Sequence, residues 1–187
     1  MLFDKIALEQ SSSEYTAKYK SSLVSGNNLI DLTGGLGIDD IYFSKMIKNI
    51  TYCEINDVVA NIFEFNLNKT NIDNITVNNC DSLDYLADLE DNSMDWIYID
   101  PARRDANRRS VDLEYCTPNV YLNLELFFQK SQNVMIKVAP AFDIKEAIRR
   151  FENLTEIHVI SLDGECKEVL LLLNKGYSNI IPKIISI

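Results

Sequence analysis

The stretch NLIDLTGGLGIDD, residues 28–40, decides the fold of this 187-residue chain. Its first five residues have the composition of a short strand, and the glycines that follow let the backbone turn sharply and approach a ligand closely. A helix pattern begins directly after them. A strand that runs through a glycine loop into a helix is the opening unit of an α/β sheet, and such a loop lies at the ligand-binding edge.

The same alternation continues through the chain. Six further strands are predicted, at 50–54, 75–79, 95–100, 133–138, 156–162 and 167–174. Helices are predicted between the first six strands, at 38–48, 57–70, 82–89, 119–130 and 143–151. The repetition predicts right-handed crossovers and a mostly parallel seven-stranded sheet with helices on both faces. Only Asp163-Gly164 and a few neighbours join the last two strands, which is a hairpin signal, so the seventh strand should run antiparallel to the sixth.

Three segments are expected in chain order. Residues 1–27 would be helical, because SSSEYTAKYK (11–20) resembles a helix start in which Ser11 opens a capping box. Residues 28–175 would form the sheet domain. The tail, 176–187, has a proline and several isoleucines and would be a final strand or the edge of a C-terminal domain that the chain lacks.

The composition is that of a single globular domain, with 47% hydrophobic and 25% charged residues. The net charge of −10 argues against a broad nucleic-acid-binding surface, although a local basic patch can still bind phosphate. No apolar run approaches the roughly 20 residues that cross a bilayer, and the start has no signal-peptide pattern. The four cysteines lie far apart, which argues against a metal site or a disulfide framework and predicts a reducing, cytoplasmic location.

The glycine loop differs from the fingerprint of dinucleotide-binding proteins. Gly35 and Gly37 are followed by Asp40 where Gly-x-Gly-x-x-Gly needs its third glycine. Asp39 and Asp40 at the helix start would repel a pyrophosphate, so a cationic ligand fits better. S-adenosylmethionine carries a sulfonium and an amino group, and the carboxylate of Asp31 would face them.

Two more acidic residues follow the next strands of the predicted sheet. Glu54 ends the second strand, where a carboxylate accepts hydrogen bonds from ribose hydroxyls, and Asp81 follows the third, placed to accept from an adenine amino group. Ile55 and Leu83 would hold the faces of the ring. Each acid alone is typical of a solvated loop. Because the ends of parallel strands meet at one edge, the three acids together predict a site for S-adenosylmethionine.

The fourth strand ends at Asp100-Pro101, at the same edge. Methyl transfer to an amine needs the nitrogen lone pair aimed at the sulfonium carbon, and the carboxylate of Asp100 can accept the amine's hydrogens and so aim it. Pro101 removes a backbone donor and stiffens the turn. Four of the chain's six arginines follow, and Arg103 and Arg104 are placed to contact substrate, for example a phosphate.

Further charged residues are interpreted more simply. Arg108 and Arg109 are expected to pair with nearby acids on a solvated loop. Lys137 ends the fifth strand at the same edge and would either meet the substrate or pair with Asp100. His158, the only histidine, lies beside apolar residues in the sixth strand and is predicted to be a hydrogen-bonded strand residue.

Four segments, DLTGGLG (31–37), YCEIN (52–56), NNCDS (78–82) and DPARR (100–104), together resemble the class I S-adenosylmethionine-dependent methyltransferases. The chain most resembles bacterial proteins in which this domain is followed by a THUMP-like domain. These are related to RNA guanine-N2 methyltransferases, including the trimethylguanosine synthase type. The resemblance covers about residues 10–174 and implies a Rossmann-like fold.

The residues and the resemblance together predict the roles of individual positions. The predicted cofactor-binding residues are Asp31, Thr33, Gly34, Gly35, Gly37, Glu54, Ile55, Asp81, Ser82 and Asp100. The predicted catalytic loop is Asp100, Pro101 and Arg103, and the predicted substrate contacts are Arg103, Arg104 and Lys137. No metal ligand is predicted.

The sequence departs from the family pattern in two places. Thr33 stands where many methyltransferases have their first glycine. Ala102 and Arg103 replace the proline and the aromatic residue that usually follow Asp-Pro or Asn-Pro in enzymes that methylate base amino groups. A guanidinium can stack on a base or bind a phosphate, so RNA remains a candidate substrate.

The expected function is therefore S-adenosylmethionine-dependent methyl transfer, to an exocyclic nitrogen of an RNA base. Two alternatives stay open. The acidic charge and the missing THUMP-like domain favour a small molecule or a protein as the acceptor. A non-catalytic partner protein that binds the cofactor is the other. The sequence does not indicate an oligomeric state.

Overall fold

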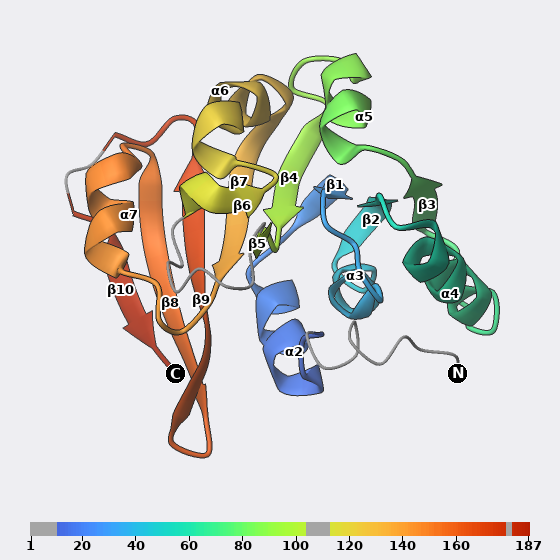
Figure 1. Ribbon diagram of the computed structural model, residues 1–187, viewed down its shortest axis with the longest axis horizontal. Helices are drawn as coiled ribbons and strands as arrows, with labels where there is room; N and C mark the ends of the chain where they lie inside the picture. Colours follow the sequence, from blue (N-terminus) through green and yellow to red (C-terminus); the bar gives the residue numbers. More distant parts are fainter. Residues whose placement is uncertain (1–10, 104–112, 179–180) are drawn as a thin grey trace.

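The structure, a computed structural model, describes residues 11–103, 113–178 and 181–187. In these ranges one sheet has eight strands, in the order β10-β8-β9-β7-β4-β1-β2-β3 (Figure 1). Its strands are β1 (Gly26–Asp31), β2 (Ile47–Glu54), β3 (Ile75–Asn79), β4 (Met94–Ile99), β7 (Ser131–Val138), β8 (Leu154–Leu162), β9 (Glu165–Asn174) and β10 (Lys183–Ser186). The helices are α2 (Glu14–Ser22), α3 (Ile38–Phe43), α4 (Asp57–Leu67), α5 (Ser82–Asp88), α6 (Val120–Lys130) and α7 (Ile144–Arg150). After β4 come two short paired strands, β5 (Ala102–Arg103) and β6 (Cys116–Thr117), and a 3₁₀ turn, Leu113–Tyr115.

Neighbouring strands of the large sheet run parallel except at β9, which is antiparallel to both β7 and β8. This confirms the predicted mostly parallel sheet with an antiparallel seventh strand. The turn that joins β8 to β9 contains Asp163 and Gly164 with φ of 54° and 79°, the left-handed conformation that tight hairpins need. Residues 183–186 of the predicted tail add β10, an eighth strand parallel to β8. The boundaries of the three predicted segments stay a prediction.

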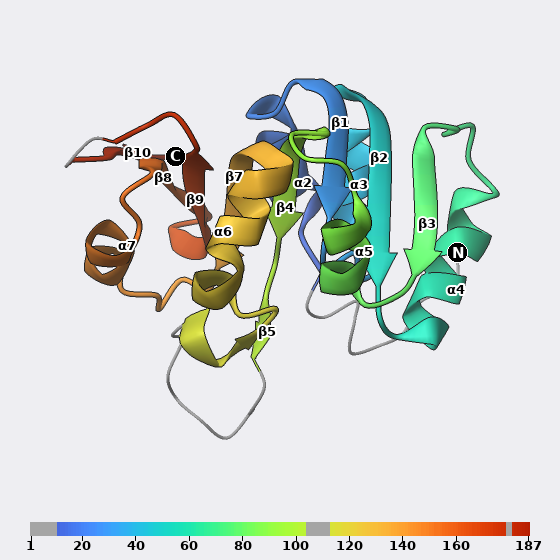
Figure 2. The same cartoon turned by 90° about the horizontal axis from the view of Figure 1, so that it is seen from above.

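Helices cover both faces of the sheet (Figure 2). On one face α2, α3 and α4 enclose a core that includes Leu29, Phe43 and Phe63. On the other face α5, α6 and α7 pack over a core that includes Ile30 and Phe127. Neighbouring residues of β1 therefore serve opposite cores, as expected of a strand buried on both faces. Within the described ranges, no helix is long and apolar enough to span a bilayer.

Local side chains start most of the helices. Asn56, Asp81, Asn119 and Asp143 cap α4, α5, α6 and α7. The cap predicted for the first helix is wrong, because Ser13 and not Ser11 accepts the N–H of Thr16, at 3.2 Å. Three serines in a row offer three caps, and tertiary contacts select one of them: the hydroxyl of Ser12 donates to Asp39 at 2.9 Å instead.

The predicted helix at 38–48 is too long. α3 ends at Phe43, and β2 begins at Ile47 rather than at residue 50. The reason is strand pairing, because Ile47 lies opposite Gly26 and extends the parallel ladder between β1 and β2. The ends of β1, β2 and β4 consequently meet at one edge of the sheet, next to the glycine loop (Figure 1).

Candidate functional site

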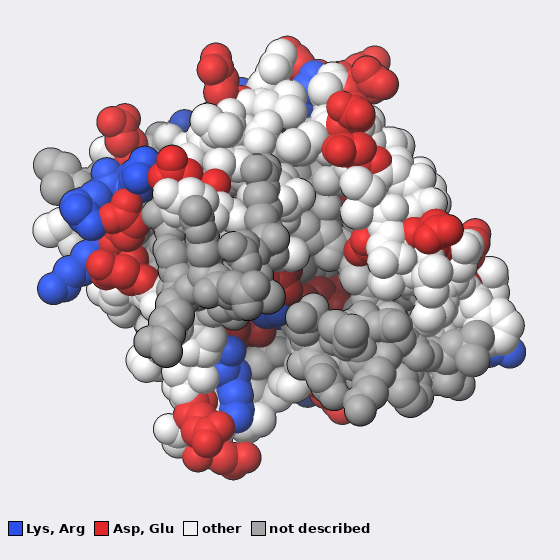
Figure 3. Space-filling model, viewed as in Figure 1, with Lys and Arg blue, Asp and Glu red and all other residues white. Residues whose placement is uncertain are grey.

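A cavity of about 470 Å³ opens at this edge. Its size is within the range of small-molecule and cofactor pockets. The lining includes every predicted cofactor-binding residue: Asp31, Thr33, Gly34, Gly35, Gly37, Glu54, Ile55, Asp81, Ser82 and Asp100. Their contacts with a cofactor stay a prediction, but the fold brings four separate segments to one cavity. In Figure 3 acidic side chains lie in the hollow at the centre of the face, with a Lys or Arg side chain beside them.

The glycines of the loop are required by packing as well as by the turn. A Cβ atom on Gly34 would lie 2.1 Å from the ring of Tyr52, and one on Gly37 would lie 2.1 Å from the ring of Phe63. Gly35 has a φ of 55°, and its N–H donates to Glu54 at 2.9 Å. The hydroxyl of Tyr52 in turn donates to the carbonyl of Gly35 at 2.6 Å. The loop is thus clamped onto β2 and α4.

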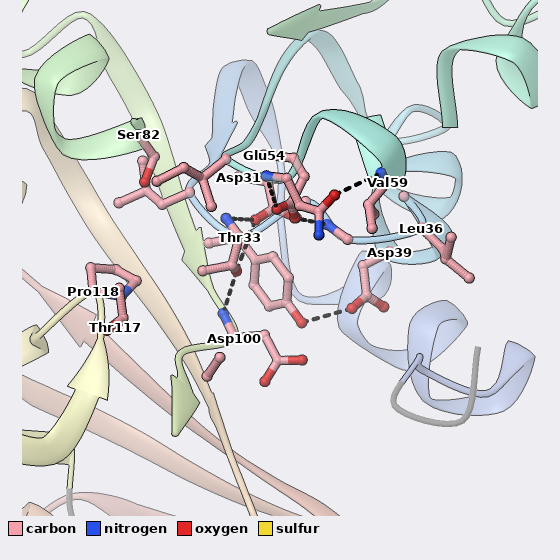
Figure 4. Close-up of a pocket in the computed structure, with 18 of the residues that line it drawn as sticks. Asp31, Thr33, Leu36, Asp39, Glu54, Val59, Ser82, Asp100, Thr117 and Pro118 are labelled. Carbon is pink, nitrogen blue, oxygen red and sulfur yellow. Dashed lines mark hydrogen bonds between the residues drawn. The ribbon is translucent and has the colours of Figure 1, made fainter. Parts of the chain in front are cut away.

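The contacts of Thr33 explain why a threonine stands where the methyltransferase pattern has its first glycine. Its hydroxyl donates to Asp31 Oδ1 at 3.2 Å and accepts the backbone N–H of Asp100 at 2.7 Å. The backbone N–H of Thr33 also donates to Asp31 Oδ1, at 2.7 Å. Figure 4 shows Thr33 between the two acids. A glycine here would lose both hydroxyl contacts, so the threonine joins the glycine loop to the loop after β4.

Asp31 is almost fully buried, with 1% of its surface exposed. Burial raises the pKa of Asp31 to about 8, and the nearby charges of Asp39 and Asp100 act in the same direction. The hydrogen bonds from Thr33 oppose this shift. Asp40, behind the loop, is 0% exposed, and burial likewise raises its pKa well above the usual range.

The two acids predicted to hold a nucleoside are fixed by backbone donors. Glu54 accepts the N–H of Gly35 at 2.9 Å with one oxygen and the N–H of Asn56 at 2.8 Å with the other. Asp81 is the N-cap of α5 and accepts the N–H of Leu83 at 2.9 Å. Each carboxylate oxygen has a second lone pair, so both side chains can still accept from a ligand.

At the opposite end of the cavity Asp100 forms an ion pair with Lys137 of β7. Burial disfavours the charge on Lys137, but the adjacent Asp100 outweighs it and raises the pKa of the lysine. Of the two interpretations of Lys137, pairing with Asp100 is therefore confirmed. Lys137 is not among the residues that line the cavity, and its contact with a substrate stays a prediction.

Residues that the sequence did not single out close this end. β5 pairs with β6, with Ala102 opposite Thr117, and both residues line the cavity together with Pro118. No local signal marks Thr117 or Pro118, because only this pairing brings them beside β4. Arg104, Arg108, Arg109 and the side chain of Arg103 lie outside the described residues.

A buried charged cluster lies on the α2 and α3 side of the sheet. Lys20 is 0% exposed, and its Nζ lies 3.0 Å from Asp39 Oδ1 and 3.0 Å from Glu168 Oε1. Asp39 lines the cavity and also accepts from the hydroxyl of Tyr98 at 2.7 Å. No local sequence pattern predicts this cluster, because its members come from α2, α3, β4 and β9.

His158 is a hydrogen-bonded strand residue, as predicted. It is 1% exposed, with Nδ1 lying 2.8 Å from the hydroxyl of Tyr19 and Nε2 lying 2.8 Å from Glu156. Burial lowers its pKa. Among the described residues, no group of three or more His, Cys, Asp and Glu side chains is arranged to hold a metal ion.

No family model and no curated protein matches the chain. Several solved structures are similar to it. A proposed methyltransferase from Porphyromonas gingivalis W83 is 28% identical, with a TM-score of 0.85 over 94% of this chain and 44% of that protein. TrmK of M. capricolum, solved with S-adenosyl-homocysteine, is 16% identical, with a TM-score of 0.66 over 90% of this chain and 71% of that protein. An rRNA methylase from Streptococcus thermophilus is 9% identical, with a TM-score of 0.60 over 94% of this chain and 98% of that protein.

The chain thus spans less than half the length of the P. gingivalis protein. Each of the three structures aligns with nine-tenths or more of this chain, whose mostly parallel sheet has helices on both faces and one antiparallel strand, β9. The chain therefore has the Rossmann-like class I fold of S-adenosylmethionine-dependent methyltransferases.

Proposed function

We propose that this protein is an S-adenosylmethionine-dependent methyltransferase. The observation that carries the proposal is the order of acids along one cavity: Asp31 and Glu54 end β1 and β2, Asp81 follows β3, and Asp100 follows β4. A ligand with a cationic end, a ribose and an adenine would have one of these acids beside each of its parts. The fold supports the same conclusion.

The residues present fit this cofactor. Asp31 would bind its ammonium group, Glu54 its ribose hydroxyls and Asp81 its adenine amino group, while Ile55 and Leu83 flank the ring. When bound, the cofactor would supply a methyl group activated by the sulfonium charge. Because backbone N–H groups hold Glu54 and Asp81, these acceptors are preorganised and lose little conformational freedom on binding.

Asp100 would orient the acceptor. Lys137 holds Oδ2 of its carboxylate, so Oδ1 would receive an N–H of the acceptor and aim the nitrogen lone pair. The same carboxylate would stabilise positive charge as it develops on that nitrogen. Pro101 stiffens the loop that carries it.

For the acceptor we propose an exocyclic nitrogen of an RNA base. The support is the resemblance of the DPARR loop to RNA guanine-N2 methyltransferases, and the guanidinium groups of Arg103 and Arg104 would contact phosphate or stack on a base. The relationship to proteins with a THUMP-like domain stays part of this proposal. So does a cytoplasmic location, which rests on the scattered cysteines.

The test is transfer of radiolabelled methyl groups from S-adenosylmethionine to size-fractionated RNA from a strain that lacks the gene. Wild type is compared with Asp100→Asn and with Asp73→Asn, a matched change at an exposed site before β3, away from the cavity. Label in one RNA fraction that disappears with Asp100→Asn and survives Asp73→Asn is the expected result.

Two other outcomes point elsewhere. No label in RNA, with S-adenosylhomocysteine still bound, would favour a small-molecule or protein acceptor, which the net charge of −10 also allows. Binding without turnover on any acceptor would indicate a non-catalytic partner protein. Absence of S-adenosylhomocysteine binding in calorimetry would overturn the proposed function altogether.

A further inference from the structure

Two carboxyl groups lie in contact behind the candidate cofactor site. Asp31 and Asp40 are 1% and 0% exposed, and their side chains are within hydrogen-bonding range of each other. Among the described residues, no other residue donates a hydrogen bond to either oxygen of Asp40. Asp31 lines the cavity, but Asp40 does not. Asp40 can therefore act on a ligand in the cavity through Asp31.

Buried carboxylates in contact repel each other, and burial penalises each charge as well. A proton on one of them removes the repulsion and supplies a donor between the two carboxyl groups. Burial accordingly raises the pKa of both groups, that of Asp31 to about 8. In the ligand-free protein near neutral pH, Asp31 and Asp40 therefore retain protons that two exposed aspartates would have lost.

The surroundings do not neutralise the pair. Its titratable neighbours are Tyr52, Cys53 and Glu54 from β2, Tyr98 from β4, Asp100 after β4, and Asp39 from α3. Lys20 and Lys137 are engaged by other acids: Lys20 binds Asp39 and Glu168, and Lys137 binds Asp100. Further acids around the pair favour its protonation.

We propose that Asp31 and Asp40 share protons in the ligand-free protein and that a ligand ammonium group displaces one of them when it binds Asp31. This inference rests on the proposed function, since the ammonium is that of the cofactor. The displaced proton leaves to solvent, so the pair gains one negative charge as one positive charge arrives. Asp40 is then a positioning residue that sets how cofactor affinity depends on pH.

The first experiment is calorimetric titration of the full chain with S-adenosylhomocysteine, in two buffers of different ionisation enthalpy. At about pH 6 to 7 the wild type should release close to one proton per ligand, and its affinity should rise about tenfold per pH unit. Both effects should fade above about pH 8, where Asp31 is already ionised. Binding without proton release would overturn the inference and leave the proposed function standing.

The second experiment uses Asp40→Asn, which keeps a hydrogen-bond donor for Asp31 and removes the second acid. Proton release at about pH 6 should fall, and affinity there should rise several-fold up to about tenfold, while affinity at about pH 9 stays that of the wild type. A merely structural role would instead weaken binding equally at every pH. Asp73→Asn is the control and should behave as the wild type.

A third measurement needs neither a ligand nor a folded variant. Carbon NMR of ¹³C-labelled aspartate in the ligand-free wild type should show two carboxyl resonances that titrate together well above the usual aspartate range. If every aspartate titrates near its ordinary pKa, the shared proton does not exist. If the titration is anomalous but S-adenosylhomocysteine does not bind at any pH, the proposed function fails and the ligand part of the inference fails with it.

Discussion

Thr33 is the residue on which the two halves of the site depend. It accepts from the loop after β4 and donates to the acid after β1, so one hydroxyl fixes Asp31 relative to Asp100. A glycine at this position would have no such group. The hydroxyl of Thr33 therefore sets the distance between the cofactor end and the acceptor end of the cavity.

Thr33→Val should destabilise the protein and weaken the site. Valine keeps the shape but leaves the N–H of Asp100 without its acceptor, which costs about 1–3 kcal/mol of unfolding free energy for a buried donor. Urea unfolding measures the loss, and calorimetry with S-adenosylhomocysteine should show weaker binding. Thr76→Val, on an exposed position of β3, is the control and should stay within about 0.5 kcal/mol. Equal stability of the two variants would contradict the bridging role.

Asp40→Asn should change how stability depends on pH. The pKa of Asp31 rises from the ordinary 3.8 to about 8 on folding, and that of Asp40 is raised too. Between these values the folded protein holds more protons than the unfolded chain, so the unfolding free energy falls as pH rises. As pH rises, the unfolding free energy of the variant should fall less than that of the wild type. The difference should be about 1.4 kcal/mol for each unit of pKa shift that the substitution removes.

Urea unfolding at about pH 5 and about pH 8 checks this expectation. The wild type should lose more stability than Asp40→Asn between the two conditions. Parallel curves would mean that the pair does not hold its protons in the folded state.

At the scale of elements, α2 is attached to the sheet by charge as well as by apolar packing. Lys20 reaches across to Asp39 on α3 and Glu168 on β9, and all three groups are largely shielded from water. Charges in such a place stabilise only while they are paired, because each would otherwise remain desolvated without compensation. The position of α2 thus depends on Lys20 as well as on apolar contacts.

Lys20→Met should lower the unfolding free energy by about 3–5 kcal/mol, because it leaves two buried carboxylates without their cation. Lys167→Met is the matched control, since Lys167 pairs with Glu165 at the exposed start of β9. That pair is exposed to solvent, so its loss should change the unfolding free energy little. Chemical denaturation of both variants measures the difference, and similar losses would show that the buried cluster contributes little.

The pairing of β4 with β7 places Lys137 beside Asp100. Lys137→Met should reduce methyl transfer by up to about 100-fold, because an acceptor that is misplaced by a small distance loses its near-attack geometry. Affinity for S-adenosylhomocysteine should change little, since Lys137 does not line the cavity. Single-turnover transfer and calorimetry separate the two effects. A loss of affinity with unchanged transfer would contradict the positioning role, and Lys175→Met, at an exposed site, should affect neither.

At the scale of the whole molecule, the negative charge limits how RNA can bind. With a net charge of −10, contact with phosphates is expected only at the arginines after β4, at 103, 104, 108 and 109. Four contacts to a single strand predict a slope of log affinity against log salt no steeper than about −3. Filter binding across a salt series measures it. A much steeper slope would indicate a second basic surface.

Local patterns in the chain were sufficient to predict much of the fold and of the candidate site. The alternation of strands and helices, the hairpin at Asp163-Gly164 and the acids at the strand ends depend on neighbours in sequence. Parallel strands bring their carboxyl ends to one edge of the sheet. The fold class alone therefore predicts that the cofactor residues lie together.

Other features depend on contacts between distant segments, and no local pattern predicts them. Pairing with Gly26 moved the start of β2, and Ser13 capped α2 because Ser12 binds Asp39. The tertiary structure alone decided the contact of Asp31 with Asp40 and the bond between Lys20 and Glu168, which are 148 positions apart. The physical reason is burial: a charge acquires its partners and its pKa only when packing removes it from water.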